Sequence, residues 1–432
     1  MRAVTWQGKR KISVETVPDP TISQPTDAIV RITTTGLCGS DLHLYEVMGP
    51  FLDAGDILGH EPMGVVEAVG ADVTELAPGD RVVLPFQISC GSCFMCDRQL
   101  YTQCETTQTR EHGMGANLIG YTKLYGQVPG GQAEYLHVPH ANFTHIKVPD
   151  GPPDERFIYL SDVLPTAWQA VEYADIEDGG TLAVLGLGPI GEMSARIAAN
   201  RGHRVIGVDI EPDRLKRSGS WDGVETIEYS RDIGDQIRDL THGRGADSVI
   251  DAVGMEAHGS PVAKAAHMAV SFLPDPLAAA MFSTAGVDRL AALKGAIDIV
   301  RRGGTVSLSG VYGGEADPLP LLTMFDKQIQ CGWVRQTSRS GSMTSCPWSA
   351  IPRIRWGWRR SPPTCCRWRT LRPPMTCSRR RRTARSRSCS SRSRQGSRGA
   401  VTSRKSNPRT CSARSTCGDR RVMPTVPDPP GV

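Results

Sequence analysis

The chain has 432 residues, enough for two or more domains with sizeable cores. Its net charge is +5, and we find no apolar run near the ~18 residues that would cross a membrane. The first ten residues lack the apolar stretch of a signal peptide, so we expect a cytoplasmic protein with no membrane partner.

The charge is distributed unequally along the chain. Residues 1–330 hold 26 Lys and Arg against 43 Asp and Glu, a net charge of −17, whereas residues 331–432 hold 24 against 2, which gives +22. The second part also has 8 of the 13 Cys and 5 of the 8 Trp, but no His, Phe, Tyr or Glu. Compositions this different indicate that the two parts should be interpreted separately.

Residues 1–150 contain short β-type runs that Gly and Pro interrupt, at 28–34, 64–70 and 81–86 among others. This pattern predicts a compact, largely antiparallel β domain. The segment 88–106 contains Cys90, Cys93, Cys96 and Cys104. Four thiolates suit one tetrahedral zinc with bonds of about 2.3 Å and leave no position for water or substrate, so we predict a structural zinc site. The alternatives are a disulfide pair and an iron–sulfur cluster.

A helix is expected over 163–176, followed by strands at 182–185, 205–209, 248–251 and 305–309 that alternate with helical stretches. Such alternation predicts an α/β fold with a doubly wound parallel sheet. The stretch 256–294 is rich in Ala and is interpreted as an insertion before the last of these strands.

The first of these strands leads directly into a glycine turn with Gly186, Gly188 and Gly191. These glycines allow a tight turn, a close approach of a pyrophosphate, and close packing of the next helix. Asp209 ends the next strand, where a carboxylate accepts hydrogen bonds from ribose hydroxyls and favours NAD over NADP. Arg214 is expected beside the adenine ribose. The alternative for the glycines and Asp209 is a purely structural turn followed by a solvated carboxylate. The alternative for Arg214 is an ordinary surface residue.

Two further motifs are T-G-L-C-G-S-D-L-H at 35–43, which contains Cys38, and G-H-E at 59–61, which contains His60. Together with the cysteine lobe and the nucleotide turn, they make residues 1–330 resemble the zinc-dependent medium-chain alcohol dehydrogenases. The resemblance implies a GroES-like, mainly β catalytic domain at 1–165 and a Rossmann NAD domain at 166–330. The segments 159–170 and 256–294 resemble the formaldehyde dehydrogenase branch.

The resemblance also implies individual roles. Cys38, His60 and Asp162 would bind a catalytic zinc, where many relatives have a second Cys in place of Asp162. Glu61 would lie behind the metal, and Asp41 would orient His60. For Asp162 the alternative is a helix N-cap.

A proton relay is implied as well: Ser40 would take the substrate's proton and pass it through the nicotinamide ribose to His43, which is otherwise an ordinary exposed His. We thus expect two zinc ions per subunit, NAD, and a homo-oligomer, either a dimer or a tetramer. The substrate would be a small alcohol, an aldehyde hydrate or a thiol adduct such as that of formaldehyde. A polyol- or threonine-type dehydrogenase is the close alternative.

Residues 331–432 have two interpretations besides a disordered or non-native tail. Basic Arg/Ser-rich segments often bind nucleic acid, although scattered Trp and Cys are unusual there. The second interpretation is a frameshift: a step back by one nucleotide forces an Asp codon at Met343 and Thr344. Over 375–392 it allows D-M-F-Q-K-K-A-D-G-T-V-K-V-V-L-K-P, the pattern of a helix end, a turn and a strand. We hypothesise a shift near codon 331 and read-through over 393–432, expect no nucleic-acid partner, and expect the altered product to fold poorly or lack activity.

Overall fold

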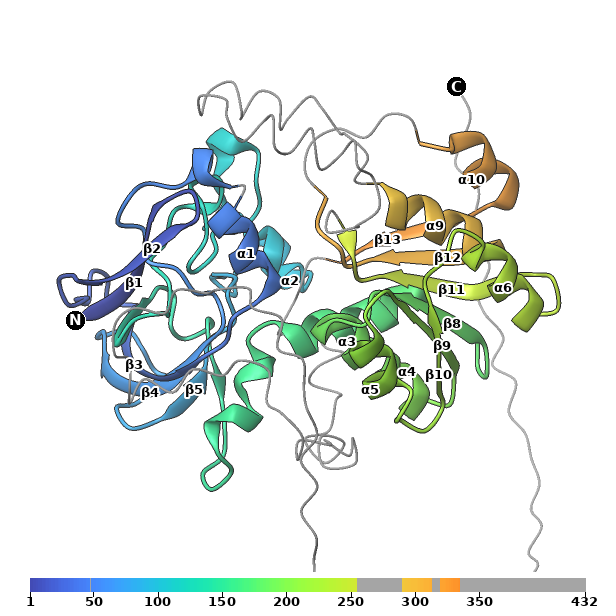
Figure 1. Cartoon of the computed structure of the whole chain (residues 1–432). Coiled ribbons are helices and arrows are strands. Elements are labelled where there is room, and N and C mark those ends of the chain that lie inside the picture. The colour runs from blue at the N-terminus through green and yellow to red at the C-terminus, as the bar shows by residue number, and fades with distance from the viewer. Residues whose placement is uncertain (47, 255–289, 313–318, 335–432) are drawn as a thin grey trace, which may run out of the picture. The chain divides into compact units, whose positions relative to one another are not determined.

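The computed structural model describes residues 1–46, 48–254, 290–312 and 319–334, which all lie within one compact unit of the chain (Figure 1). The predicted border at 165/166 is not separately tested and stays a prediction. Most of the predicted insertion at 256–294 and the predicted tail from 335 onward lie outside the described residues. Among the described helices, none is long and apolar enough to span a bilayer.

The N-terminal half is built from antiparallel sheets. A hairpin pairs β1 (Arg2–Gly8) with β2 (Lys11–Thr16), and a five-stranded sheet has the order β6-β3-β4-β5-β7. Its strands are β3 (Ala28–Thr35), β4 (Pro62–Val69), β5 (Arg81–Val83), β6 (Tyr135–Val138) and β7 (Ile146–Lys147). A buried apolar cluster that includes Val30, Val66 and Leu136 joins them. The predicted antiparallel β fold is confirmed.

Short helices connect these strands. The α-helices are α1 (Gly39–Glu46) and α2 (Phe94–Asp97). The 3-10 helices are η1 (Gly49–Phe51), η2 (Tyr101–Gln103), η3 (Arg110–His112), η4 (Lys123–Tyr125), η5 (Asp154–Arg156) and η6 (Ile158–Leu160).

A six-stranded parallel sheet with the order β10-β9-β8-β11-β12-β13 forms the second half. Its strands are β8 (Thr181–Leu185), β9 (Arg204–Asp209), β10 (Val224–Glu228), β11 (Ala246–Asp251), β12 (Val300–Leu308) and β13 (Gln330–Trp333). The chain leaves β8 in one direction for β9 and β10, and returns to the other side for β11, so the strand order reverses between β8 and β11. Ligands bind at the carboxyl ends of strands at such a reversal.

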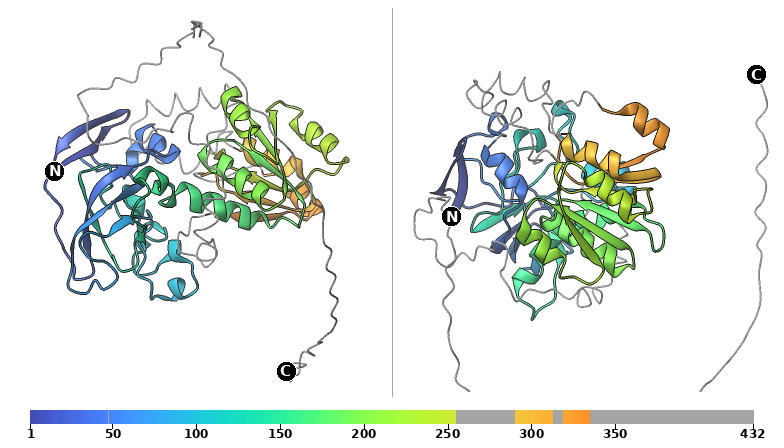
Figure 2. Two further views of the ribbon diagram at one scale, coloured as in Figure 1. Left: turned by 90° about the horizontal axis from the view of Figure 1, so that it is seen from below. Right: turned by 45° about the vertical axis from the view of Figure 1, so that its right-hand side comes forward.

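Helices cover both faces of this sheet (Figure 1 and Figure 2). One face packs on α3 (Val163–Ala174), α4 (Pro189–Asn200) and α5 (Pro212–Ser218). The other packs on α6 (Ile233–Leu240), α9 (Ala291–Ile299) and α10 (Leu321–Lys327). Because both faces are covered, the central strands are largely buried, as in β8, where four of five residues are buried. The predicted doubly wound α/β fold is confirmed.

Several observed bounds differ from the expected ones, and three of these differences matter for the fold. Helix α3 ends at Ala174, two residues early, because Asp175 adopts a left-handed conformation and closes the helix. Strand β12 begins at Val300, five residues early, across a Gly-containing segment that lacked a strand pattern. Strand β13 continues through Trp333, so it enters the segment predicted as tail.

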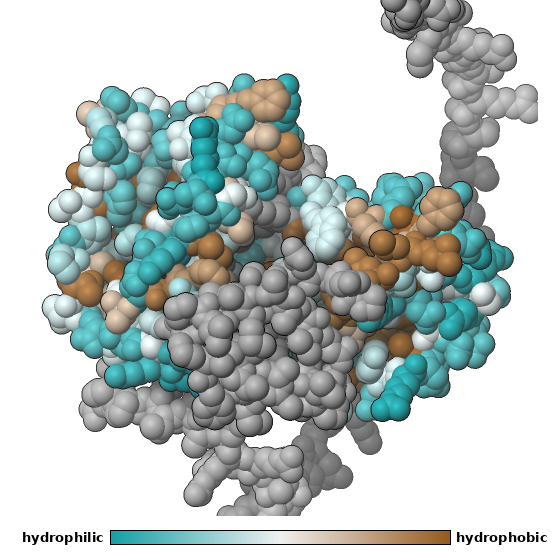
Figure 3. All heavy atoms as spheres, turned by 90° about the horizontal axis from the view of Figure 1, so that it is seen from above, coloured by the Kyte–Doolittle hydropathy of each residue, from teal (hydrophilic) through white to brown (hydrophobic). Residues whose placement is uncertain are grey.

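Exposed apolar side chains gather on α10 and at the end of β13. Leu322 and Phe325 are 80% and 81% exposed, and Trp333 is 62% exposed. The space-filling view from above shows apolar surface on this half of the molecule (Figure 3). Exposed apolar patches are typical of contact surfaces. The predicted homo-oligomer stays a prediction.

Candidate active site and metal centres

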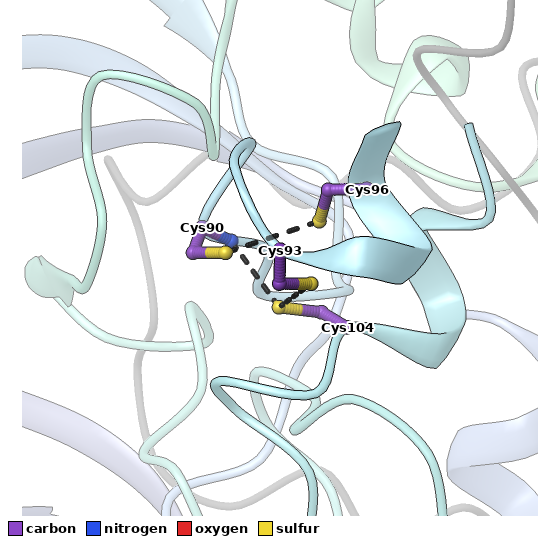
Figure 4. A group of neighbouring side chains, drawn as sticks. All are labelled: Cys90, Cys93, Cys96 and Cys104. Atoms are coloured by element: carbon purple, nitrogen blue, oxygen red, sulfur yellow. Dashed lines mark hydrogen bonds between the residues drawn. The ribbon is translucent and has the colours of Figure 1, made fainter. Parts of the chain in front are cut away.

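The four predicted lobe cysteines come together in one cluster, with their sulfurs pointing toward one another (Figure 4). Cys90 Sγ lies 4.0 Å from Cys96 Sγ, and Cys93 Sγ lies 3.8 Å from Cys104 Sγ. A tetrahedron with zinc–sulfur bonds of about 2.3 Å has edges of about 3.8 Å. All four cysteines are free thiols in the structure, so the sulfur spacing fits a zinc ion and not a disulfide pair.

Backbone N–H groups surround these sulfurs. Ser92 N donates to Cys90 Sγ at 3.5 Å, and Glu105 N donates to Cys93 Sγ at 3.4 Å. Burial acts to raise the pKa of Cys93, but the N–H groups of Cys96 and Glu105 outweigh it and lower that pKa to about 6. Donors aimed at sulfur favour the thiolate, which is the form that binds metal.

A second cluster joins Cys38, His60, Glu61 and Asp162, whose donor atoms all lie within 4.8 Å of one another. Each residue lies just before the start of a helix or strand: Cys38 precedes α1, His60 and Glu61 precede β4, and Asp162 precedes α3. The chain makes room for Glu61 at Gly36, where a Cβ would lie 1.9 Å from Glu61 Oε2. The structure thus brings together the residues that the resemblance places around a catalytic zinc.

Asp162 occupies the N-cap position of α3, yet its side chain makes no capping hydrogen bond. Its Oδ2 lies 3.4 Å from His60 Nε2 and 3.5 Å from Cys38 Sγ, while Oδ1 accepts a hydrogen bond from Thr166 Oγ1 at 2.8 Å. The carboxylate is therefore held by the helix and directed at the cluster, which favours the ligand role over the capping alternative.

Asp41 lies behind His60, as expected for a carboxylate that orients the ring. Its Oδ2 accepts the N–H of Cys38 at 3.0 Å, and its Oδ1 lies 3.2 Å from His60 Nδ1. The distance between Asp41 Oδ1 and His60 Nδ1 allows an ion pair, but the two atoms are not aligned for a hydrogen bond. Fixing one ring nitrogen leaves the other, Nε2, to face Cys38 and Asp162.

The electrostatics of this cluster fit a divalent cation. Burial and the neighbouring Asp162 raise the pKa of the Cys38 thiol to about 11 and that of Glu61 to about 8. A buried oxygen of Glu61 has no hydrogen-bond partner. Sulfur, imidazole and carboxylate are the ligand types of zinc, and a thiolate with one carboxylate would neutralise its charge.

The predicted nucleotide turn has the expected backbone. Gly186 follows β8 with φ of +85°, which only Gly adopts without strain, and Gly188 caps the N-terminus of α4. At Gly191 a Cβ would lie 1.8 Å from Gly186 O, so the close packing of helix on turn requires glycine. The N-terminus of α4 thus presents backbone N–H groups of the kind that can bind an anion.

Asp209 ends β9 with a carboxylate that the backbone holds in place. Its Oδ2 accepts the N–H of Leu187 at 2.6 Å, and its Oδ1 accepts that of Ile210 at 2.8 Å. Arg214 lies beside it, with Nη1 3.5 Å from Oδ2. Arg214 thus lies at the end of the strand, and its expected place beside the adenine ribose stays a prediction.

One pocket of about 450 Å³ connects these groups. Its lining contains Cys38, Ser40, His43 and Glu61 from the first half of the chain, and Gly186, Gly188, Asp209 and Arg214 from the second. Gly191 is absent from the lining, consistent with a packing role. Ser40 and His43 line the same pocket as Cys38, and their relay role stays a prediction.

Several residues near the site had no signal in the sequence. Tyr121 and Phe86 both pack edge-on against the His60 ring, with centroids at 5.8 and 5.7 Å. Burial raises the pKa of Tyr121 to about 12. At the carboxyl ends of β11 and β12, Tyr312 donates to the buried Asp251, whose Oδ1 also accepts the N–H of Val253 at 2.9 Å. This bond joins two segments that line the pocket.

Comparisons with known proteins agree with this geometry. Residues 24–150 match the alcohol dehydrogenase GroES-like domain, and residues 189–269 match the zinc-binding dehydrogenase family. An uncharacterized zinc-type alcohol dehydrogenase-like protein of Bacillus subtilis is 40% identical over 334 residues, 76% of this chain and 84% of the relative. The glutathione-independent formaldehyde dehydrogenase of Pseudomonas aeruginosa is 35% identical over 60% of this chain and 66% of its own.

Among solved structures, the alcohol dehydrogenase TADH from Thermus sp. ATN1 matches with a TM-score of 0.63 and 33% identity, covering 78% of this chain and 85% of its own. The predicted cofactors, zinc and NAD, are confirmed by these matches together with the two donor clusters. Since the Bacillus subtilis relative is 40% identical and matches over most of the length of both chains, the protein belongs to the zinc-dependent medium-chain alcohol dehydrogenase family of oxidoreductases.

Proposed function

We propose that the protein oxidises a small alcohol, or the hydrate or thiol adduct of formaldehyde, with NAD as hydride acceptor. The observation that carries this proposal is the pocket whose lining includes Cys38 and Glu61 of the cluster together with Gly186 and Gly188 of the turn. A substrate oxygen at the cluster and a cofactor on the turn would share this one pocket. The similarity to a formaldehyde dehydrogenase supports the narrower substrate class.

Each residue has a chemical task in this proposal. Cys38, His60 and Asp162 hold the zinc, and Asp209 with the N-terminus of α4 holds the NAD. Bound zinc lowers the pKa of an alcohol, and bound NAD accepts hydride. Ser40 takes the proton from the substrate hydroxyl, and His43 receives it nearer the solvent. Asp41 keeps His60 in one orientation.

A substrate panel tests this function. The full chain, loaded with zinc, is assayed by NADH absorbance with formaldehyde, formaldehyde plus a small thiol, primary alcohols, polyols and threonine. We expect the highest kcat/KM with formaldehyde or a short primary alcohol. A preference for polyols or threonine would assign the chain to the alternative dehydrogenase type. An Asp162→Asn variant, which keeps the shape and removes the charge, should lose one zinc and the activity together.

The basic segment that begins at residue 331 is proposed to be a shifted translation, not a nucleic-acid-binding module. The support is the readable alternative frame, and the segment beyond 334 lies outside the described residues. The gene sequence around codon 331 tests the shift, and salt-dependent RNA binding lost on truncation at 330 would favour the other interpretation. If this reading frame yields soluble and active enzyme, the expectation that its product is inactive is wrong. We also propose that the protein is cytoplasmic and forms a homo-oligomer.

A further inference from the structure

Tyr312 and Asp251 join two segments of the pocket wall. Asp251 ends β11 and is fully buried, and the Tyr312 hydroxyl donates a hydrogen bond to its Oδ2. The other oxygen, Oδ1, accepts the N–H groups of Val253 at 2.9 Å and Gly254 at 3.1 Å. One carboxylate therefore fixes the turn after β11 and also holds a side chain from the segment after β12.

The segment after β12 is tied to Asp251 on both sides of Val311. Before it, Gly310 N donates to the main-chain oxygen of Asp251 at 2.9 Å, and Ser309 Oγ donates to the same oxygen at 2.9 Å. After it comes the hydroxyl bond of Tyr312. Val311 itself lines the pocket and is 54% exposed. The Tyr312 bond therefore fixes the position of an apolar residue that a ligand in the pocket would cover.

The place of these segments in the sheet selects one end of the proposed cofactor. Asp209 ends β9, where a carboxylate binds the adenosine ribose, and the pyrophosphate lies at the N-terminus of α4. A dinucleotide crosses the point at which the strand order reverses, so its second nucleotide extends over β11 and β12, on the other side of β8. We therefore expect Val311 to lie beside the nicotinamide end of NAD.

We propose that Tyr312 is a positioning residue for the nicotinamide end of NAD, an inference that rests on the proposed function. Its bond to Asp251 holds Val311 in place in the free protein, so the cofactor does not have to order this segment when it binds. Burial and the nearby Asp251 raise the pKa of Tyr312, and the hydroxyl therefore stays protonated as the donor. Tyr312 does not line the pocket itself, so it acts through the segment that it holds.

Binding of NAD and of ADP-ribose to the zinc-loaded full chain tests this role. ADP-ribose has the adenosine and both phosphates of NAD but lacks the nicotinamide ring. Tyr312→Phe keeps the ring of the tyrosine and removes its hydroxyl. We expect the Kd for NAD to rise roughly 3- to 10-fold, the effect of one hydrogen bond, and the Kd for ADP-ribose to stay within about twofold, both by calorimetric titration. A merely structural bond would lower the Tm without changing the ratio of the two Kd values.

Tyr173→Phe is the matched control, because it also removes a tyrosine hydroxyl that forms a hydrogen bond. Tyr173 lies on α3 and does not line the pocket, and its hydroxyl accepts a hydrogen bond from Gln169 Nε2 at 3.0 Å. Both Kd values should stay within about twofold of those of the wild type.

A second variant separates binding from folding. Tyr312→Phe takes a donor away from a buried carboxylate and therefore also costs stability. Tyr312→Phe in an Asp251→Asn background avoids the buried charge and should show the same selective loss of NAD binding.

Equal weakening of NAD and ADP-ribose, or an unchanged Kd for NAD, would overturn the inference. Failure of both variants to fold would overturn it too, because the pair would then be a requirement of the fold. A wild-type chain that does not bind NAD would overturn the proposed function and this inference with it. A wild type that binds NAD, together with variants that show no selective loss, would overturn the inference alone.

Discussion

The substitution Gly191→Ala tests the nucleotide turn most directly. A Cβ at this position would lie 1.8 Å from the carbonyl oxygen of Gly186 and 3.3 Å from the Cβ of Ala252. Side-chain carbons essentially never approach a backbone atom closer than 3.0 Å, so helix and turn must separate by about 1.2 Å. The obstacle is backbone and not a flexible side chain, so no rotamer change can relieve it.

Overpacking of this kind costs about 1 to 3 kcal/mol. We therefore expect the Tm of Gly191→Ala to fall by roughly 2 to 10 °C. The displaced N-terminus of α4 would also bind the pyrophosphate less well, and we expect the Kd for NAD to rise at least about tenfold, or 1.4 kcal/mol. Thermal unfolding followed by circular dichroism and calorimetric titration with NAD measure the two effects.

Two matched glycines separate packing from binding. At Gly188 a Cβ meets nothing within 4 Å, but the residue lines the pocket, so Gly188→Ala should raise the Kd for NAD while the Tm stays within a few degrees. At Gly295, inside α9, a Cβ also meets nothing, so Gly295→Ala should change neither, apart from a gain in helix propensity of up to about 1 kcal/mol. An unchanged Tm in Gly191→Ala would refute the close packing of α4 on the turn.

Three further predictions concern the lobe, a helix end and a buried carboxylate. Cys96→Ser should reduce the zinc content by one ion per chain and lower the Tm, as measured by elemental analysis and thermal unfolding. Lys327→Met should lower the free energy of unfolding by about 1 to 3 kcal/mol in urea titration, because Lys327 Nζ donates to three carbonyls at the end of α9, at 2.8 to 2.9 Å. Burial acts to raise the pKa of Asp27, but hydrogen bonds from His137 Nε2 at 2.7 Å, Ser23 Oγ at 2.7 Å and Gln24 N at 2.8 Å together outweigh it and lower that pKa. The stability that the Asp27 carboxylate contributes is present above about pH 4 and is lost as pH falls through the lowered pKa. In Asp27→Asn, the free energy of unfolding should therefore depend less on pH below about 4. The same pH dependence in variant and wild type would contradict this role of Asp27.

Local patterns made the metal lobe and the nucleotide turn predictable. The cysteines from Cys90 to Cys104 lie within fifteen residues, so their spacing alone limits how they can meet. The glycines at 186, 188 and 191 likewise form a single strand–turn–helix unit. In both cases the residues that carry the chemistry lie in one short segment of the chain. Sequence patterns describe such local arrangements well.

Residues that meet across long distances in the chain gave no such signal. Tyr121 packs against the His60 ring, and Tyr312 donates a hydrogen bond to Asp251, in both cases from sixty-one residues further along the chain. A tyrosine in a loop has many possible partners, and only the packing of the β domain and the register of β11 on β12 select one. Strand β12 was placed five residues late for a similar reason: pairing with β11 extends it across residues with weak intrinsic strand propensity.

The position of Asp162 has a mechanical consequence for the metal centre. This residue directly precedes α3, a helix of twelve residues that packs against α4 and contacts β11 and β12 in the nucleotide-binding sheet. Cys38 and His60 belong to the β domain. One proposed ligand is thus attached to the helix that packs on the nucleotide-binding sheet, and two belong to the β domain, so we expect a displacement of the sheet to reach the proposed metal site through α3. Cobalt substituted for zinc should report this coupling as a change in its visible spectrum when NAD binds.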